Sequence, residues 1–306
     1  PAFNDMWLPV FGGEVIAALD ESNFLPEMVN KRTITSGQSA KFPASWKMGT
    51  EYHEAGTELL GIQMDTREYT ISVDDRRITA HFFVDDIDEA MSHFQIRGEL
   101  ATQAGKGLAR RDSQNVWRLL INCSRTAKGN ATSFPGGGIN GDGLAHIDAA
   151  LATANAAGAA AVLNAIATAV VYWDQNDVPF NDRYCIVSPA MYYQIRKLGT
   201  LTSASAGALP LIGHNDIDTV NPKITEMTAK LQPLQHLGVN IVRSNDQRNG
   251  IDESAVGLPT KYAGNWTNTQ GVIFQREAIA HLTLLGVKTA SQRIETRGQD
   301  FCVTKM

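Results

Sequence analysis

The stretch DDIDEAMSHFQIRGELATQAGKGLARRDSQNVWRLL, residues 85–120, decides the fold class of this chain. Its apolar side chains recur at helical spacing, at Ile87, Met91, Phe94, Ala101, Ala104, Leu108, Val116, Leu119 and Leu120. A helix of this length would extend ~50 Å at ~1.5 Å per residue, which is longer than a compact domain requires. We therefore predict one long helix over this stretch.

Four carboxylates begin this helix, on Asp85, Asp86, Asp88 and Glu89. Such a cluster could bind a metal ion or act as an acid/base pair. Carboxylates in a first turn also complement the unpaired amides and the positive end of the helix dipole, each contributing ~0.3–1 kcal/mol. We favour this second interpretation, in which the cluster marks the start of the helix.

Three glycines, Gly98, Gly105 and Gly107, lie within the predicted helix. Each costs the helix up to ~1 kcal/mol relative to alanine. Their presence indicates close contact with another segment along that face of the helix.

Residues 31–84, upstream of the helix, read as strands because apolar and polar side chains alternate. The apolar positions are Thr33, Ile34, Ala40 and Phe42 on the outward run, Tyr69, Ile71 and Val73 on the return, and Ile78, Ala80, Phe82 and Val84 on a further run. Residues 43–65 are rich in glycine and charge, with too few large apolar side chains for a core. We predict one long, protruding hairpin. Because an isolated hairpin buries too little surface to offset its conformational entropy, another molecule should hold it in place.

The first 30 residues carry many apolar side chains but only a short helical repeat, at Val15, Ile16 and Leu19. The apolar group consists of Phe3, Met6, Trp7, Leu8, Val10 and Phe11. Such an arm cannot bury itself, so we expect it to lie on its own subunit or on a neighbour.

Helix and strand signals alternate beyond the long helix, which predicts a mixed domain. A loop rich in Gly, Ser and Asn over 128–143 marks a domain boundary. The expected elements are an Ala-rich helix over 144–173, a buried strand over 184–187, a helix opened by Ser188-Pro189, a strand over 239–242, a polar loop over 244–267 and strands from Gly271.

The composition is that of a globular protein with one large or two modest domains: 306 residues, 43% hydrophobic, 19% charged, net charge -5. Acidic and basic residues are interspersed, so we do not expect tightly held nucleic acid. Cys123, Cys185 and Cys302 are too dispersed for a zinc site or a disulfide framework, and fit a reducing cytoplasm. We find no signal peptide and no run of ~18 apolar residues that would predict a membrane span.

Residues 136–141, GGGING, have the G-x-G-x-x-G spacing of a dinucleotide site. Such a site needs a hydrophobic strand before the glycines and an acidic residue ~20 positions later. Here Ser133-Phe134-Pro135 precedes the glycines, and the region around Ala161 is apolar. A flexible loop is the favoured interpretation. A dinucleotide-dependent enzyme is the alternative, which a nucleotide titration of the subunit would test.

The 7 histidines are dispersed and none forms the i, i+4 pair of a helical zinc site. The sequence also carries no nucleophile elbow and no P-loop. We expect no catalytic, cofactor-binding or metal-binding residue and no enzymatic activity, while a triad assembled in space would leave no such motif.

Several segments, in order along the chain, resemble the major capsid proteins of T7-type phages. They are FGGEV at 11–15, RTITSGQSAKFP at 32–43, DIDEAMSHF at 86–94 leading into 97–108, residues 184–193, GVNIV at 238–242 and residues 274–282. No single motif decides this resemblance, which rests on their order.

The resemblance implies an α+β protein with the HK97-like phage capsid fold. Its parts would be an N-arm (1–31), an extended E-loop hairpin with flanking strands (32–84), a P-domain with the long spine helix (85–143), a mixed α/β A-domain (144–267) and C-terminal strands that return to the P-domain (268–306). The polar 244–267 loop would lie near the tip of the A-domain.

The resemblance further implies a structural major capsid protein that self-assembles, through hexamers and pentamers, into the icosahedral shell around a phage double-stranded DNA genome. Implied partners are a scaffolding protein, a portal, a decoration protein and the packaged DNA, with no cofactor and no membrane. The shell would assemble in the bacterial host cytoplasm and end in the virion. An encapsulin-type compartment shares the fold and is the alternative. We expect intersubunit contacts from charged side chains on the hairpin and helix: Lys41, Lys47, Glu51, Glu54, Glu58, Arg97 and Glu99.

Overall fold

The computed structural model describes residues 11–19, 25–45, 50–54, 56, 58, 61, 66–74, 76–85, 87, 91, 96–125, 154–200, 234–254, 258–267, 269–284 and 286–306. A helix over residues 11–19 comes first. The elements that follow are η1 (Leu25–Met28), β1 (Asn30–Ile34), β2 (Ser39–Ser45), β3 (Thr66–Ser72), β4 (Thr79–Asp85), α3 (Ile96–Arg125), α4 (Ala156–Gln175), β5 (Arg183–Val187), α5 (Pro189–Thr200), β6 (Leu234–His236), β7 (Val239–Arg243), η5 (Thr260–Tyr262), β8 (Gly271–Gln275), η6 (Arg276–Ala278), β9 (Ala280–Leu284), β10 (Lys288–Ile294) and β11 (Gln299–Lys305).

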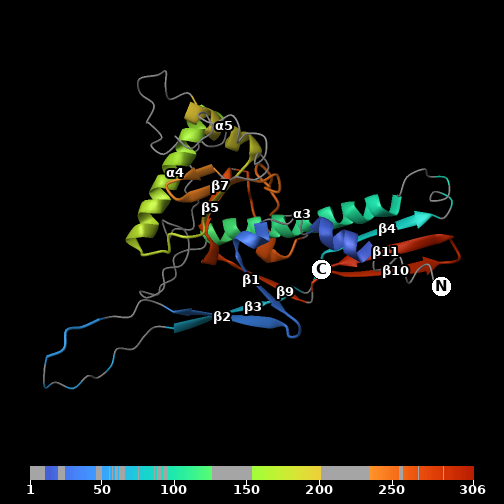
Figure 1. The fold of residues 1–306 in the computed structure, drawn as a ribbon, viewed down its shortest axis with the longest axis horizontal. Helices are drawn as coiled ribbons and strands as arrows, with labels where there is room; N and C mark the ends of the chain where they lie inside the picture. Colours follow the sequence, from blue (N-terminus) through green and yellow to red (C-terminus); the bar gives the residue numbers. More distant parts are fainter. Residues whose placement is uncertain are drawn as a thin grey trace, which may run out of the picture.

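Helix α3 runs along the centre of the molecule and confirms that a long helix forms here (Figure 1). Its start was predicted wrongly, because Asp85 ends β4 and α3 begins at Ile96. Its 30 residues span ~45 Å at ~1.5 Å per residue. Just upstream, the Asp85 carboxylate accepts a hydrogen bond of 2.9 Å from the amide of Ile87, as expected of a carboxylate at a helix start. Asp86, Asp88 and Glu89 lie outside the described residues.

The N-terminal half of α3 packs on a three-stranded antiparallel sheet of order β10-β11-β4 and on the 11–19 helix. Phe11 and Val15 of that helix are buried with Ala101 and Cys302. This part of the arm therefore lies on its own subunit. The other apolar residues that suggested a sticky arm, up to Val10, lie outside the described residues.

Two of the three glycines in α3 lie beside the 11–19 helix, as predicted. A Cβ on Gly105 would lie 2.5 Å from the carbonyl oxygen of Val15, and one on Gly98 would lie 3.5 Å from the Glu14 carboxylate. Gly107 differs, because a Cβ there would meet nothing within 4 Å. The 11–19 helix thus crosses α3 where the absence of a side chain permits close approach.

The middle of the chain forms a four-stranded mixed sheet of order β6-β7-β5-β8, with α4 and α5 packed together on it. Strand β5 is buried, as predicted, and the Ser188 hydroxyl accepts a hydrogen bond of 3.3 Å from the Met191 amide at the start of α5. Strand β8 follows residue 267, where we expected the chain to leave this region, yet it pairs with β5.

Helix α4 is the one helix among the described residues that is long and apolar enough to cross a membrane, by length and composition. This differs from the prediction that no apolar run in the chain is long enough for a membrane span. Its buried side chains belong to the core of the mixed domain: Ala159, Val162, Leu163 and Ile166. That placement is typical of a core helix in a globular domain.

The described residues of the predicted polar loop over 244–267 contain only η5 and one isolated bridge, between Asp252 and Asn265, but the segment is partly buried. Trp266 is fully buried, and its ring lies 5.5 Å from that of Trp117 on α3. Arg125 of α3 donates to the Asn265 carbonyl at 2.7 Å. The segment therefore lies against the C-terminal half of α3 instead of at a domain tip, because its few apolar side chains have a partner there.

The remaining strands form two small sheets at the underside of α3 (Figure 1). Strands β1 and β9 pair in parallel, and β2 and β3 pair as an antiparallel hairpin. The sequence suggested that β1 and β4 continued this hairpin. They pair instead with β9 and β11, respectively. Strand β11 buries Cys302 and Thr304, and β9 contacts α3 through His281 and Asp112.

Candidate intersubunit contact surface

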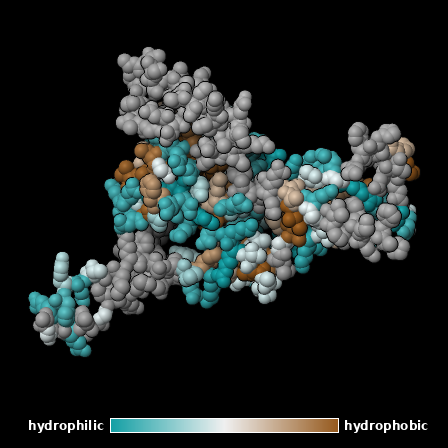
Figure 2. Space-filling model, in the orientation of Figure 1, coloured by the Kyte–Doolittle hydropathy of each residue, from teal (hydrophilic) through white to brown (hydrophobic). Residues whose placement is uncertain are grey.

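The β2–β3 hairpin extends away from the rest of the molecule (Figure 1). Among the described strands, β2 and β3 pair only with each other, from Ser39 opposite Ser72 to Ser45 opposite Thr66. Ala40 is buried, but Tyr69 is 52% exposed, and Tyr52 beyond the strands is fully exposed. Figure 2 shows the described residues beyond the strands in mainly hydrophilic colours. Among the described strands the hairpin thus has two open edges, and its described residues beyond the strands are mainly polar (Figure 2).

Two contacts anchor the root of the hairpin. Arg32 of β1 donates to the Lys41 carbonyl at 2.9 Å, and its guanidinium lies 5.7 Å from the centre of the Phe42 ring. On the return side, Asp74 pairs with Lys261 and accepts a hydrogen bond of 2.6 Å from the Tyr262 hydroxyl. Burial raises the pKa of Tyr262, and Asp74 raises it further, so this hydroxyl stays a donor.

Replacing Asp74 with alanine should loosen the return strand. The variant loses an ion pair and a charge-assisted hydrogen bond worth ~1.5–3 kcal/mol. We expect faster hydrogen exchange in residues 66–74, measured by mass spectrometry. Glu68→Gln is the control, because the Lys41–Glu68 pair of 2.7 Å is exposed on both sides and should contribute ~0–1 kcal/mol. Equal exchange in Asp74→Ala and the unmodified chain would contradict this role.

The structure places the predicted contact residues in three different settings. Glu51, Glu54 and Glu58 are exposed in the segment beyond the hairpin strands, while Lys47 lies outside the described residues. Lys41 pairs within the hairpin with Glu68.

The two candidates on α3 have partners in their own subunit. Arg97 donates to the Asp300 carboxylate of β11 at 2.8 Å, with its side chain 19% exposed. This leaves little of its charge for a neighbour. Glu99 is exposed and accepts a hydrogen bond of 2.9 Å from Gln103.

Sequence reasoning missed a buried ion cluster that holds α3 to the 244–267 segment. Glu253 accepts hydrogen bonds from Arg118 at 2.8 and 3.1 Å, from Arg248 at 2.9 Å and from the Trp266 indole at 3.2 Å. Burial alone would raise the pKa of Glu253, but the hydrogen bonds and charges of Arg118 and Arg248 lower it to about 2. Nothing in the local sequence marks this pair, because its members lie far apart in the chain.

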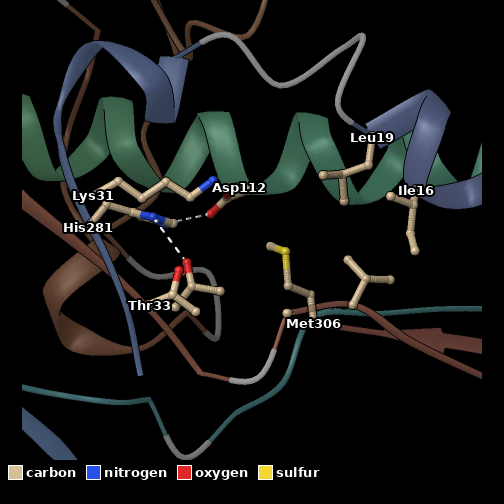
Figure 3. Close-up of a pocket in the computed structure, with 10 residues that line it drawn as sticks. Ile16, Leu19, Lys31, Thr33, Asp112, His281 and Met306 are labelled. Carbon is tan, nitrogen blue, oxygen red and sulfur yellow. Dashed lines mark hydrogen bonds and ion pairs between the residues drawn. The ribbon is translucent and has the colours of Figure 1, made fainter. Parts of the chain in front are cut away.

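A second polar contact lies in a cavity of about 210 Å³ between the 11–19 helix, α3, β1 and β9 (Figure 3). His281 Nε2 lies 3.0 Å from Asp112 Oδ1, and His281 Nδ1 lies 3.5 Å from the Thr283 hydroxyl. The order Thr, His, Asp matches that of a hydrolase triad. However, 3.5 Å is a long contact between nucleophile and base, and the cavity is smaller than a ligand pocket of ~300–1,000 Å³. The pair instead joins β9 to α3.

The described residues contain no group of three His, Cys, Asp or Glu side chains that could hold a metal ion. The glycine motif at 136–141, on which the dinucleotide alternative depends, lies outside the described residues. The polar side chains in the described part of the chain therefore either form contacts within the subunit or lie exposed on its surface.

A family model described as Gp10A-like, major capsid protein, matches residues 41–306. The chain belongs to this family. The family match includes the hairpin from Lys41 onward, α3 and every strand from β4 to β11.

The chain is similar to capsid proteins of several phages. The major capsid protein of Escherichia phage T7 is 34% identical over 106 residues, which are 34% of this chain and 30% of the T7 protein. The capsid structure of the cyanophage P-SCSP1u has a TM-score of 0.68 and 28% identity, covering 91% of this chain and 81% of that one. The mature capsid of bacteriophage PhiM1 has a TM-score of 0.60 and 14% identity, covering 93% and 82%. The expected α+β, HK97-like capsid fold is confirmed.

Proposed function

We propose that this chain is a structural subunit that assembles with its own copies into the icosahedral shell of a phage. The observation that carries the proposal is the β2–β3 hairpin. It extends beyond the body of the subunit, and neither of its edges pairs with another described strand. The chain that carries it belongs to a major capsid protein family. Open strand edges present unpaired backbone groups that another chain can pair with or cover. A subunit of this shape is complete only beside a neighbour.

The cohesion of such a shell should rest on extended apolar and backbone contact. Exposed ion pairs, such as those available to Glu51 or Glu58, contribute only ~0–1 kcal/mol each. Stable interfaces bury ~1,200–2,000 Å² in total, which one hairpin and its receiving surface can approach. Because the same contacts repeat over many copies, individually weak contacts can hold the shell together.

The proposed assembly includes hexamers and pentamers of this chain around packaged double-stranded DNA, formed with a scaffolding protein in the host cytoplasm. A portal at one vertex and a decoration protein complete the proposed partners. Within the subunit we propose the N-arm, E-loop, P-domain and A-domain divisions given above, except that β8 joins the A-domain sheet and the 244–267 segment lies against α3. We propose no enzymatic role. Genome-filled particles would support this shell over an encapsulin-type compartment, which would hold protein cargo.

Deleting residues 47–64 should abolish closed shells, because the hairpin then cannot reach a neighbour. Assembly is measured by electron microscopy of the chain expressed with a scaffolding protein. In a second variant, a Gly-Ser linker of equal length replaces residues 47–64. This variant keeps the length of the segment but removes its side chains, so comparing the two variants shows which of these properties assembly needs. Circular dichroism confirms that each variant is folded. Normal closed shells from the deletion variant would overturn the proposal.

A further inference from the structure

Arg111 is a partly buried arginine at the middle of α3. Within the part of the chain that the structure describes, it makes no hydrogen bond and no ion pair. Burial lowers its pKa, and the charges of Arg118 and Arg248 lower it too, against the opposing effect of Glu253. Two cations and one carboxylate therefore act on a guanidinium group that no described side chain pairs with.

Glu253 has no acceptor site left for Arg111. Its Oε1 accepts hydrogen bonds from Arg118 at 3.1 Å and from Arg248 at 2.9 Å. Its Oε2 accepts hydrogen bonds from Arg118 at 2.8 Å and from the Trp266 indole at 3.2 Å. An ionised carboxylate offers about four lone-pair sites, so these bonds occupy them all. Arg111 is therefore close enough to feel the charges of the cluster but is not one of its hydrogen-bonded members.

Arg248 carries further unused donors beside this cluster. Its Nε and Nη2 contact the Glu253 carboxylate at 2.9 and 2.8 Å. Its Nη1 makes no hydrogen bond with a described residue, and the side chain is 31% exposed. The neighbouring Gln247 has a buried amide nitrogen, Nε2, for which the described residues supply no acceptor. Unpaired donors of this kind are unfavourable unless an acceptor from outside the subunit meets them.

Two more cations extend this basic region along α3. Arg110 is 60% exposed and lies 3.5 Å from the Asp246 carboxylate, which is a long ion pair. Lys106 is exposed, pairs with no described residue, and precedes Arg110 by about one helical turn, or ~6 Å. Since the whole chain has a net charge of -5, this excess of cations is a local feature. It could not be read from the sequence, because Arg248 is far from α3 in the chain.

A phosphate group has the chemistry that these donors lack in the subunit. It carries one or two negative charges and several acceptor oxygens, and a guanidinium group can bind two of those oxygens at once. Three arginines, at 111, 118 and 248, share the single carboxylate of Glu253, so two positive charges remain in excess. A bound phosphate would neutralise this excess and accept from the unused donors.

We propose that Arg111 and the Nη1 end of Arg248 bind a phosphate group. The group can come from inorganic phosphate or from the backbone of a nucleic acid. In the second case Lys106 and Arg110 contact the adjoining phosphates, because they continue the basic region along α3. The site goes beyond the shell function, since all of its residues lie in one subunit and the unassembled chain already has them.

Thermal unfolding of the unassembled full chain tests the site, with sodium chloride of equal ionic strength as the reference salt. Inorganic phosphate at about five times its Kd should raise the Tm by about 2–4 °C more than chloride does. Arg111→Gln should lose this additional rise. Without phosphate, Arg111→Gln should unfold at the same temperature as the unmodified chain or higher, because the substitution removes repulsion from Arg118 and Arg248. Arg297→Gln is the matched control, since Arg297 is an exposed arginine on the turn between β10 and β11, and it should keep the full rise.

Fluorescence anisotropy with a short double-stranded DNA distinguishes the two sources of phosphate. If the backbone is the ligand, Lys106→Gln should weaken DNA binding and reduce the slope of log K against log salt by about 0.9, while leaving the Tm rise with inorganic phosphate unchanged. A Tm rise without DNA binding would assign the site to free phosphate. The proposal is overturned if phosphate stabilises the unmodified chain no more than chloride does, or if Arg111→Gln keeps the full rise. A lower Tm of Arg111→Gln in the absence of phosphate would also overturn it, since Arg111 would then have a structural role.

Discussion

Replacing Glu253 with glutamine is expected to lower the free energy of unfolding of the subunit by about 3–5 kcal/mol. The substitution removes the carboxylate that faces Arg118, whose side chain is fully buried. A buried guanidinium without a counter-charge bears its full desolvation cost, and Arg248 loses its partner as well. Because domains are stable by only ~5–15 kcal/mol, the substitution should remove a large fraction of the total stability.

Urea denaturation, followed by tryptophan fluorescence, measures this effect, since Trp117 and Trp266 lie beside the cluster. Glu295→Gln is the control. Glu295 also pairs with an arginine, Arg293 at 3.1 Å, but its side chain is 80% exposed. We expect a change of ~0–1 kcal/mol there. If Glu253→Gln and Glu295→Gln lower the free energy of unfolding by similar amounts, burial does not explain how much the Glu253 cluster stabilises the subunit.

Acid provides an independent measurement on the same cluster. The pKa of Glu253 is about 2 in the folded chain and ~4.3 for an unperturbed glutamate. A lowered folded-state pKa means that the unfolded state binds the proton first. The stabilisation is therefore present above pH ~4.3 and is lost as pH falls from there through about 2. Glu253→Gln should show a shallower dependence of stability on pH across this range.

Replacing Gly105 with alanine is expected to lower the free energy of unfolding by about 1–3 kcal/mol, although alanine is the better helix former. The added methyl group would lie 2.5 Å from the carbonyl oxygen of Val15 and 2.9 Å from the Ala18 Cβ. A backbone carbonyl cannot rotate away as a side chain can. The 11–19 helix must then move off α3, which uncovers Leu108 and Ala109 beneath Leu19.

Gly107→Ala is the matched control on the same helix. Nothing lies within 4 Å of a Cβ at Gly107, so only helix propensity changes and stability should rise by up to ~1 kcal/mol. Chemical denaturation of the two variants should give changes of opposite sign. Hydrogen exchange in residues 11–19 should rise only in Gly105→Ala. A stabilised Gly105→Ala subunit would mean that the 11–19 helix does not hold this position.

The candidate surface could be predicted only in part. The hairpin followed from its alternating strands and from a tip without a core, and the exposed Glu51 and Glu58 followed from their place in that tip. Arg97 shows the limit of this reasoning. It was expected at an interface because it is charged, yet Asp300, two hundred residues later, sits beside it. Charge alone does not say whether the partner lies in the same subunit.

Local patterns of side chains therefore determined the helices, strands and caps of this protein. The long helix, the Ser188 cap and the buried β5 strand depend on periodicity and on hydrogen bonds between near neighbours. Tertiary structure alone decided which strands pair, as β1 with β9 and β4 with β11, and where Glu253 meets Arg118. Those contacts join residues far apart in the chain, and their free energy depends on burial that exists only once the chain has folded.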